Sequence, residues 1–268
     1  MPDTGYAALH EAACARGETT YADPETGFVV FTRDGLLARE RCCGAGCRHC
    51  PFEHESVPLN RRASRIQQAA WLSDARPQTA REVTILFWSG GKDSFLAYRA
   101  LQRLGTAEII LLTTFDARSR IIAHQEFDIG AVVEQAKALK APLIGVPLHS
   151  GIDYVDQIVT ALALVPECWR LAFGDLHLEH IRGWREEAFA NHPQTRDLAL
   201  DFPLWHAEYD QLMADLEASG AKCQISAVGD ALSGVGVGDP FNRDFVARLS
   251  DEIDAFGENG EFHTKIVI

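Results

Sequence analysis

The sequence predicts an α/β protein with a doubly wound, mainly parallel sheet and a small cysteine-rich segment in front of it. Two observations lead to this fold class. From residue 83 onward, short continuous apolar runs alternate with stretches of helical pattern, which is typical of a parallel sheet covered by helices on both faces. Before residue 83 this alternation is missing, and four cysteines fall within residues 42–50. We therefore expect two parts, residues 1–80 and residues 81–268.

The apolar runs and helical stretches of the second part define its expected elements. Strands are expected at residues 83–88, 108–115, 142–148, 169–175 and 222–228, and helices at residues 94–105, 127–140, 154–165, 180–191 and 209–220. The runs are of the type that is buried on both faces, and Gly105 closes the first helix as glycines commonly do. Residues 1–80 are expected to hold a short strand (28–32) and a helix over 60–75, followed by a linker at 76–81.

Composition and charge limit the cellular compartments and the binding partners that are expected for this protein. The net charge is −13, of which −1 falls on residues 1–80 and −12 on residues 81–268. Such a surface repels a phosphate backbone, so a tRNA partner is disfavoured, although residues 39–76 carry seven arginines against four acids. No apolar run approaches the roughly 18 residues of a membrane helix, and the N-terminus lacks the pattern of a secretory signal. We expect a cytoplasmic protein without membrane contact, and the sequence does not predict its oligomeric state.

A short loop lies between the first expected strand and its helix. Its residues are Ser89, Gly90, Gly91, Lys92, Asp93 and Ser94. The glycines let backbone N–H groups approach a ligand, and the following helix N-terminus favours an anion. The serines add hydroxyl donors and the lysine adds a positive charge. Because the aspartate would repel phosphates unless Mg²⁺ bridges them, the loop predicts a phosphate site with Mg²⁺, against the alternative of a structural turn.

The order Ser-Gly-Gly-Lys-Asp-Ser in this strand–helix context closely resembles the PP-loop of ATP pyrophosphatases, the adenine nucleotide alpha-hydrolase-like superfamily. The resemblance implies a HUP-like domain that binds ATP with Mg²⁺ and cleaves it between the α and β phosphates. It implies that the six loop residues bind ATP, together with Thr114 and Gly174 at the ends of other strands. Lys92 and Asp93 are expected to take part in catalysis.

Three later segments resemble the diphthine–ammonia ligase branch of that superfamily. They are FGDLHLEHIRGWRE (173–186), FPLWHAEYDQLMADLEASGAKCQISAV (202–228) and GENGEFHTKIVI (257–268). The resemblance, which covers residues 83–268, implies catalytic roles for Asp175 and Glu179. Substrate contacts are expected at His177, Arg182, Glu258 and Glu261. The final segment reads Phe-His-Thr where the branch more often has Tyr-Glu-Thr, so the acceptor substrate stays open.

From the residue types alone, these assignments have structural alternatives. Asp175 follows a strand and precedes a helix, so it also suits a helix cap. Glu179 and Arg182 are three residues apart and share a helix face, which also fits a surface ion pair. Glu258 and Glu261 are flanked by glycines and also fit a solvated turn.

Four cysteines, Cys42, Cys43, Cys47 and Cys50, lie in a stretch with two glycines that suits a tight loop around an ion. In a cytoplasmic protein such clustering favours a metal over disulfides. Thiolates suit Zn²⁺ or an iron–sulfur cluster, and the sequence leaves these two undecided. The alternative is a set of reduced, free thiols.

Together these patterns predict an ATP-dependent ligase. It activates a carboxyl or amide oxygen as an adenylate, releases pyrophosphate and then lets an amine displace AMP. The acceptor is a small molecule or a protein. One alternative is an iron–sulfur-dependent PP-loop tRNA sulfurtransferase, which the cysteines favour and the negative charge opposes. A non-catalytic nucleotide or metal sensor is another alternative, opposed by the full set of loop side chains.

Overall fold

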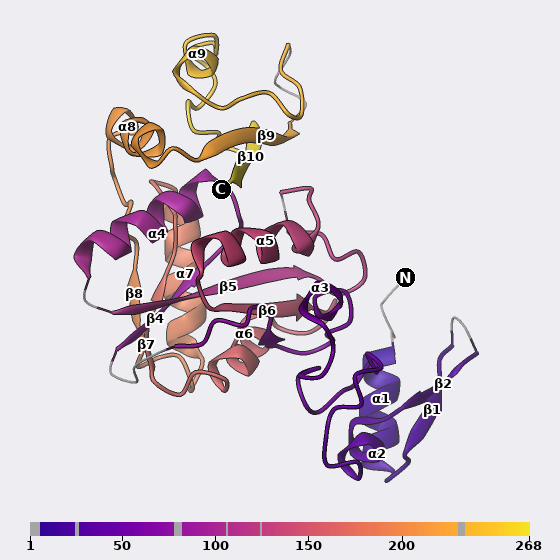
Figure 1. The fold of residues 1–268 in the computed structure, drawn as a ribbon. Coiled ribbons are helices and arrows are strands. Elements are labelled where there is room, and N and C mark those ends of the chain that lie inside the picture. The colour runs from indigo at the N-terminus through magenta and orange to yellow at the C-terminus, as the bar shows by residue number, and fades with distance from the viewer. Residues whose placement is uncertain (1–5, 25–26, 78–81, 106, 124, 230–233) are drawn as a thin grey trace.

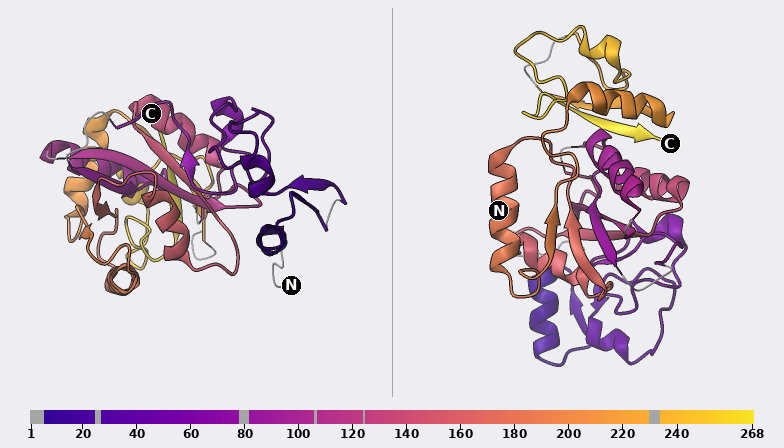
Figure 2. Two further views of the ribbon diagram at one scale, coloured as in Figure 1. Left: turned by 90° about the horizontal axis from the view of Figure 1, so that it is seen from below. Right: turned by 90° about the vertical axis from the view of Figure 1, so that its left-hand side faces the viewer.

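The computed structural model describes residues 6–24, 27–77, 82–105, 107–123, 125–229 and 234–268. Three parts follow one another along the chain (Figure 1): an N-terminal module (residues 6–57), a sheet domain (residues 58–208) and a C-terminal unit (residues 209–268). The turned views in Figure 2 show the sheet domain between the other two parts. Within the described ranges, no helix combines the length and apolar character that a membrane span requires.

Six strands form the central sheet. They are β3 (Ala70–Trp71), β4 (Val83–Phe87), β5 (Glu108–Asp116), β6 (Leu143–Leu148), β7 (Cys168–Ala172) and β8 (Ala199–Asp201). The order across the sheet is β3-β6-β5-β4-β7-β8, in which β4 to β8 run parallel and β3 runs antiparallel to β6. The chain thus fills the sheet outward from β4, first on one side and then on the other. This order confirms the predicted doubly wound fold class and places a crevice at the carboxyl ends of the strands beside β4.

Four helices cover the two faces of the sheet: α4 (Lys92–Leu104), α5 (Ile129–Leu139), α6 (Tyr154–Leu162) and α7 (Glu179–Asn191). Leu86 of β4 packs in the core that α4 and α5 cover, whereas its neighbour Ile85 packs in the core that α6 and α7 cover. Consecutive strand residues point to opposite faces. Because both faces are covered by helices, both sets of side chains must be apolar, which explains the continuous apolar runs of the sequence.

The ends of these helices follow from single residues. Gly105 takes a left-handed conformation (φ 61°) and ends α4, as predicted. α5 and α6 begin after Asp128 and Asp153, whose carboxylates accept backbone N–H groups of the first helical turn. These carboxylates satisfy backbone N–H groups that have no partner within the helix.

The N-terminal module contains α1 (Tyr6–Ala15), β1 (Thr20–Ala22), β2 (Val29–Phe31) and α2 (Arg33–Leu37). β1 and β2 pair as an antiparallel hairpin, and β2 is the strand predicted at residues 28–32. The cysteine loop follows α2 and leads toward the sheet domain.

The prediction of a helix over residues 60–75 is wrong. Only α3 (Leu59–Arg62) is helical, and the chain then runs into β3 at the edge of the sheet. Ile66 and Leu72 are buried against Gly145 of β6, so burial on the sheet decides the conformation here rather than helical propensity. The sheet therefore includes residues on the N-terminal side of the boundary expected at residue 80, while the linker expected at 76–81 lies largely outside the described residues.

The C-terminal unit contains α8 (Tyr209–Ser219), β9 (Lys222–Val228), α9 (Arg243–Val246) and β10 (Phe262–Val267). Residues 222–228 form a strand as predicted, but their expected place in the parallel sheet is wrong, because β9 pairs antiparallel with β10 in a separate ribbon. This ribbon and α8 pack in one core with α4. β8 and β10 were not expected, since β8 has three residues and β10 alternates buried with partly exposed ones.

The contact of β3 with β6 predicts a strong effect at Gly145. A Cβ at this position would lie 2.4 Å from a methyl carbon of Leu72, which is itself 1% exposed. We expect Gly145→Ala to lower the free energy of unfolding by about 1–3 kcal/mol, as overpacking of a core typically does. Urea denaturation measures this change.

Gly183→Ala is the matched control. Gly183 lies inside α7, and a Cβ there meets nothing within 4 Å. Alanine at this site is expected to leave the stability unchanged or to raise it by up to about 1 kcal/mol. Equal effects of the two substitutions would contradict the close packing of β3 on β6.

Candidate functional site

The loop that joins β4 to α4 lies at the crevice beside β4. Gly90 has a positive φ (82°), and a Cβ there would lie 2.7 Å from the side chain of Gln135, so this position requires glycine. Gly91 is the N-cap of α4. The hydroxyls of Ser89 and Ser94 lie 3.3 Å apart, and Ser94 donates to the Gly91 carbonyl at 3.0 Å. The helix N-terminus therefore opens on the crevice with two hydroxyl groups beside it.

A buried glutamine holds this loop in place. Gln135 of α5 accepts a hydrogen bond from the Trp88 indole at 2.9 Å and donates to the carbonyls of Gly90 at 2.9 Å and Ile266 at 2.7 Å. One side chain thus joins the end of β4, the loop and β10. Because Gln135 is 4% exposed, the indole N–H and the Ile266 carbonyl would lose a buried partner without it.

β10 closes the loop through the backbone as well. The Ile266 N–H donates to the Gly90 carbonyl at 2.9 Å, and the Thr264 hydroxyl accepts the Lys92 N–H at 3.0 Å. Lys92 and Thr264 are 172 residues apart in sequence. The C-terminal unit is therefore part of the loop's framework.

Lys92 is buried behind the loop. The residue is 3% exposed, and its Nζ lies 2.8 Å from the Asp93 carboxylate and within 6.0 Å of the centres of three phenylalanine rings of the C-terminal unit. Burial acts to lower the pKa of Lys92, but the carboxylates of Asp93 and Glu258 outweigh it and raise the pKa above its ordinary value. The ammonium group stays charged, and aromatic faces add to its stabilisation.

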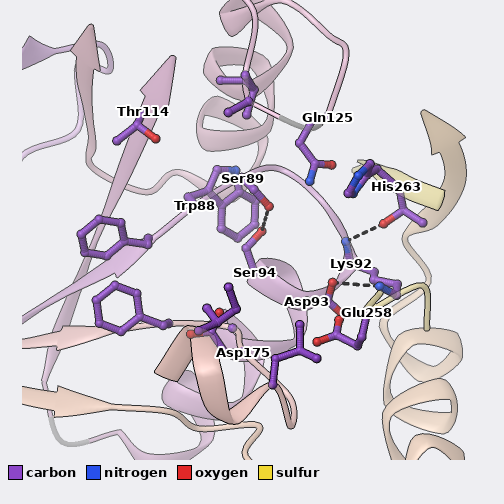
Figure 3. A pocket seen from close by; sticks show the side chains of 18 of the residues that line it. Trp88, Ser89, Lys92, Asp93, Ser94, Thr114, Gln125, Asp175, Glu258 and His263 are labelled. Carbon is purple, nitrogen blue, oxygen red and sulfur yellow. Dashed lines mark hydrogen bonds and ion pairs between the residues drawn. The ribbon is translucent and has the colours of Figure 1, made fainter. Parts of the chain in front are cut away.

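Glu258 faces the pair formed by Lys92 and Asp93 from the C-terminal unit (Figure 3). Burial and the nearby Asp93 carboxylate raise the pKa of Glu258 to about 8, although Lys92 acts in the opposite direction. The Asp93 Oδ1 atom is buried and has no hydrogen-bond partner among the described residues. Carboxylates thus outnumber cations here, so this part of the site favours a bound proton or cation.

The end of β7 forms the opposite wall. Arg185 of α7 donates to the two carboxylate oxygens of Asp175 at 2.6 and 3.0 Å, and its guanidinium lies 4.4 Å from the centre of the Phe173 ring. A Cβ at Gly174 would lie 2.9 Å from the backbone of Asp93. The strand end therefore packs directly on the start of α4, which holds Asp175 beside the loop.

These walls enclose a pocket of about 480 Å³. They come from the ends of β4 to β7, from α6 and α7, and from the segment before and within β10. Eight of the residues predicted as site residues line the pocket: Ser89, Lys92, Asp93, Ser94, Thr114, Gly174, Asp175 and Glu258. The fold thus brings together residues from four separate segments of the sequence.

Glu179 and Arg182 do not line the pocket. Glu179 is exposed and its carboxylate lies 3.8 Å from His206, while Arg182 donates to Glu186 on the next helical turn at 2.8 Å. Arg185, which lies one turn beyond Arg182, lines the pocket. The two arginines are three residues apart and share a helix face, so the helical pattern alone did not distinguish them.

His177 and Glu261 also lie outside the pocket lining. The Nδ1 atom of His177 is 3.2 Å from the Tyr209 hydroxyl. Glu261 accepts two backbone N–H groups of the turn at residues 254–259, both at 3.0 Å. The carboxylate of Glu261 therefore shapes the turn that presents Glu258, and the solvated turn considered from the sequence is a structured one.

The pocket holds further side chains that were not among the predicted site residues: Trp88, Gln125, Tyr154, Arg185, His263 and Thr264. Burial raises the pKa of Tyr154 to about 12, so its hydroxyl stays protonated at neutral pH. Figure 3 shows how Gln125, His263 and Asp175 surround the loop. Arg185, His263 and Thr264 lie within the segments 173–186 and 257–268, which were noted for their resemblance, but the sequence did not single them out as site residues.

The cysteine loop lies in the N-terminal module and contributes nothing to this pocket. The sulfur atoms of Cys43 and Cys47 are 3.4 Å apart, and those of Cys42 and Cys50 are 3.8 Å apart. Cys42 is buried and Cys43 is exposed, so these two neighbours face different environments. A backbone hydrogen bond at Ala45 lowers the pKa of Cys43, whereas burial raises the pKa of Cys47 to about 11.

The metal site predicted at these four cysteines is not assembled. No group of three or more His, Cys, Asp or Glu side chains in the described ranges is placed to hold a metal ion. Structural zinc and iron–sulfur clusters need four such donors around one ion or cluster, or three with an open position. The thiols make two close contacts instead, Cys43 with Cys47 and Cys42 with Cys50, and Cys47 also packs against the cluster that holds Cys42 and Cys50.

The similarities to known proteins include one to a protein family and one to a solved structure. Residues 9–56 match the model of a family described as a family of unknown function (DUF5522). Among solved structures, the chain is similar to the Candida glabrata FMN adenylyltransferase in complex with FAD and inorganic pyrophosphate, with 13% identity, a TM-score of 0.31, and coverage of 52% of this chain and 48% of that chain. The similar region thus spans about half of each chain, and the fold class rests on the strand order described above.

The buried hydrogen bonds of Gln135 predict a large loss of stability on substitution. We expect Gln135→Leu to lower the free energy of unfolding by about 2–4 kcal/mol, because the substitution leaves at least two buried polar groups unpaired. Gln102→Leu is the matched control, since Gln102 is exposed and its side chain donates one hydrogen bond among the described residues, to the Tyr98 hydroxyl at 2.9 Å. Chemical denaturation measures both, and a similar small loss in each would contradict the role assigned to Gln135.

The raised pKa of Glu258 predicts a pH-dependent effect. Between about pH 5 and pH 8 the native Glu258 holds a proton that the unfolded chain has released, so its contribution makes the protein less stable as the pH rises. We expect Glu258→Gln to be more stable than the native protein by about 1–3 kcal/mol at pH 8, because one pKa unit corresponds to about 1.4 kcal/mol. The gain should vanish near pH 5.

The Glu261→Gln variant is the control, because the pKa of Glu261 is shifted in the opposite direction. Burial acts to raise the pKa of Glu261, but backbone hydrogen bonds outweigh it and lower the pKa. Its stabilising effect is present at neutral pH and is lost as the pH falls through the native pKa. Denaturation curves across this pH range test both variants, and parallel pH profiles for the native protein and Glu258→Gln would contradict the raised pKa.

Proposed function

We propose that this protein is an ATP-dependent ligase of the PP-loop type, which forms AMP and pyrophosphate. One observation carries the proposal. The glycine-containing loop at residues 89–94 opens, at the point where the strand order reverses, on a pocket of about 480 Å³ that also contains Asp93, Asp175 and Glu258. This position is where open parallel sheets bind their ligands, and the volume suits a nucleotide-sized molecule.

The loop supports binding of the phosphates. Its backbone, the N-terminus of α4 and the hydroxyls of Ser89 and Ser94 favour phosphate oxygens. Lys92 contributes its charge from behind the loop, where Asp93 and the phenylalanine rings hold it. The apolar side of the pocket, which includes Leu112 and Leu148, suits the adenine ring.

The carboxylates of the site suit Mg²⁺. The Asp93 Oδ1 atom is buried without a hydrogen-bond partner among the described residues, and Glu258 lies beside it. Mg²⁺ is usually held by one or two protein carboxylates together with phosphate oxygens, so no larger protein ligand set is required. Asp93 and Glu258 would hold the ion. Bound Mg²⁺ would offset the negative charge of the triphosphate.

The proposed reaction has two steps. A carboxyl or amide oxygen of the acceptor attacks the α-phosphorus of ATP, the bond to the β-phosphate oxygen breaks, and pyrophosphate leaves with both electrons of that bond. Ammonia or another amine then attacks the activated carbon and AMP leaves. The loop amides and Lys92 stabilise the charge that develops on pyrophosphate. Arg185 holds Asp175 in the wall of the pocket, where it is placed to contact the acceptor.

The finer assignment within the superfamily is a diphthine–ammonia ligase type of reaction on a small molecule or a protein acceptor. It rests on the three sequence segments described above, of which 173–186 and 257–268 both contribute to the pocket. The tRNA sulfurtransferase alternative requires an iron–sulfur cluster, and the cysteines of the described chain do not form the three-thiolate group that it needs. A nucleotide sensor would bind ATP without turnover.

The nucleotide products test the proposal. In the absence of acceptor, water takes the acceptor's place and we expect slow conversion of α-labelled ATP to AMP with release of pyrophosphate. Asp93→Asn should reduce the rate about 100-fold or more, as loss of a charged group in a preorganised site commonly does. Glu187→Gln, at an exposed position of α7, should keep the native rate.

Chromatography of the labelled nucleotides and a pyrophosphate assay provide the measurement. Accumulation of ADP would reject adenylate formation. ATP binding without any turnover, even with ammonium and carboxylate acceptors present, would favour the sensor. If the Asp93→Asn variant kept the native rate, Asp93 of the loop would have no part in the reaction, which would contradict the proposal.

A further inference from the structure

We propose that Cys43 and Cys47 form a peroxide-reactive dithiol site that closes reversibly into an intramolecular disulfide. The cysteine loop lies outside the nucleotide pocket, and the ligase reaction makes no use of it. The four thiols are arranged as two pairs with sulfur–sulfur distances of 3.4 and 3.8 Å. Pairs of thiols at such distances suit two-electron disulfide chemistry, whereas a zinc or iron–sulfur centre needs three or four donors together.

The geometry of the first pair favours closure. A disulfide bond is about 2.05 Å long, so the sulfurs of Cys43 and Cys47 need only a small approach from 3.4 Å. Three residues separate the two cysteines, and two of these, Gly44 and Gly46, take positive φ angles of 71° and 74°. A Cβ at Gly44 would lie 3.0 Å from the carbonyl oxygen of Ser56. The glycines thus allow the tight loop that brings the two thiols together.

Accessibility distinguishes the two pairs. Cys43 is exposed and Cys47 is partly buried, so an oxidant in solution reaches Cys43 first. Cys42 and Cys50 are 6% and 4% exposed and form a buried cluster with Val57, against which the partly buried Cys47 packs. The inner pair is therefore shielded from the reagent that the outer pair meets, and a single disulfide is expected in the folded protein.

The reaction balances with hydrogen peroxide as the oxidant. The Cys43 thiolate attacks one peroxide oxygen, the O–O bond breaks, and hydroxide leaves while a sulfenic acid forms on Cys43. The Cys47 sulfur then attacks the Cys43 sulfur, the S–O bond breaks, and the Cys47 proton leaves with the hydroxyl group as water. Two thiols lose two hydrogens and two electrons, and one peroxide becomes two waters. A dithiol reductant reverses the change.

The sequence provides a direct test by peptide mapping. The full protein is reduced, freed of metal by a chelator, treated with hydrogen peroxide and blocked with an alkylating reagent under denaturing conditions. Trypsin cuts after Arg41 and Arg48, so Cys42, Cys43 and Cys47 fall in one peptide and Cys50 in the next. The proposed disulfide lies inside peptide 42–48. That peptide should lose two hydrogen masses and carry a single alkyl group. Reduction with dithiothreitol before alkylation should restore all three alkyl groups.

Variants and alternative outcomes complete the test. Cys42→Ser should still form the disulfide, whereas Cys43→Ser and Cys47→Ser should not. A disulfide-linked pair of peptides 42–48 and 49–61 would assign the reaction to the inner pair and overturn the proposal. Three alkyl groups on peptide 42–48 after peroxide, or oxygen added to Cys43 without a disulfide, would also overturn it. Stoichiometric zinc or iron in the untreated native protein would also overturn the proposal if the Cys43→Ser variant lacked that metal.

Discussion

The hydrogen bonds of Gln135 are the interaction on which the candidate nucleotide site depends. This side chain is provided by a helix of the sheet domain, and it holds the indole of Trp88, the carbonyl of Gly90 and the carbonyl of Ile266 at once. A flexible glycine-containing loop would otherwise sample many conformations. The glutamine and β10 restrict it to one, so the cost of ordering the loop is met during folding rather than during ligand binding.

The charges of the site are arranged around the same loop. Lys92 lies behind it with Asp93, and Glu258 and Asp175 approach from two other directions. Since the carboxylates are in excess, the pocket disfavours a triphosphate alone and favours one accompanied by a cation. The raised pKa of Glu258 means that the free protein compensates part of this excess with a proton. Nucleotide, metal and proton binding are therefore coupled in the proposed enzyme.

The sequence was sufficient to predict those elements whose local pattern agrees with their tertiary contacts. The strands β4 to β7, the helices between them and the pocket residues near Ser89 follow from continuous apolar runs and one motif. The sequence was insufficient where long-range contacts decide the conformation. Residues 60–75 leave a helical pattern to pack on the sheet, and β9 pairs with β10 rather than with the sheet. Arg185 lines the pocket and the predicted Arg182 does not, and only the fold of α7 against β7 distinguishes these two residues, which share one helical face.

The sequence distance between the loop and the strand that closes it has a consequence for the order of assembly. Lys92 and Thr264 are separated by 172 residues, and a ribosome adds roughly 5–20 residues per second. The central sheet can therefore form while β10 is still unmade, and the loop waits roughly ten to thirty seconds for the partner that shapes it. The last strand of the sheet, β8, ends at Asp201, so the complete sheet exists beside an unclosed loop only in the later part of that interval. The loop takes its final shape once residue 266 has been made.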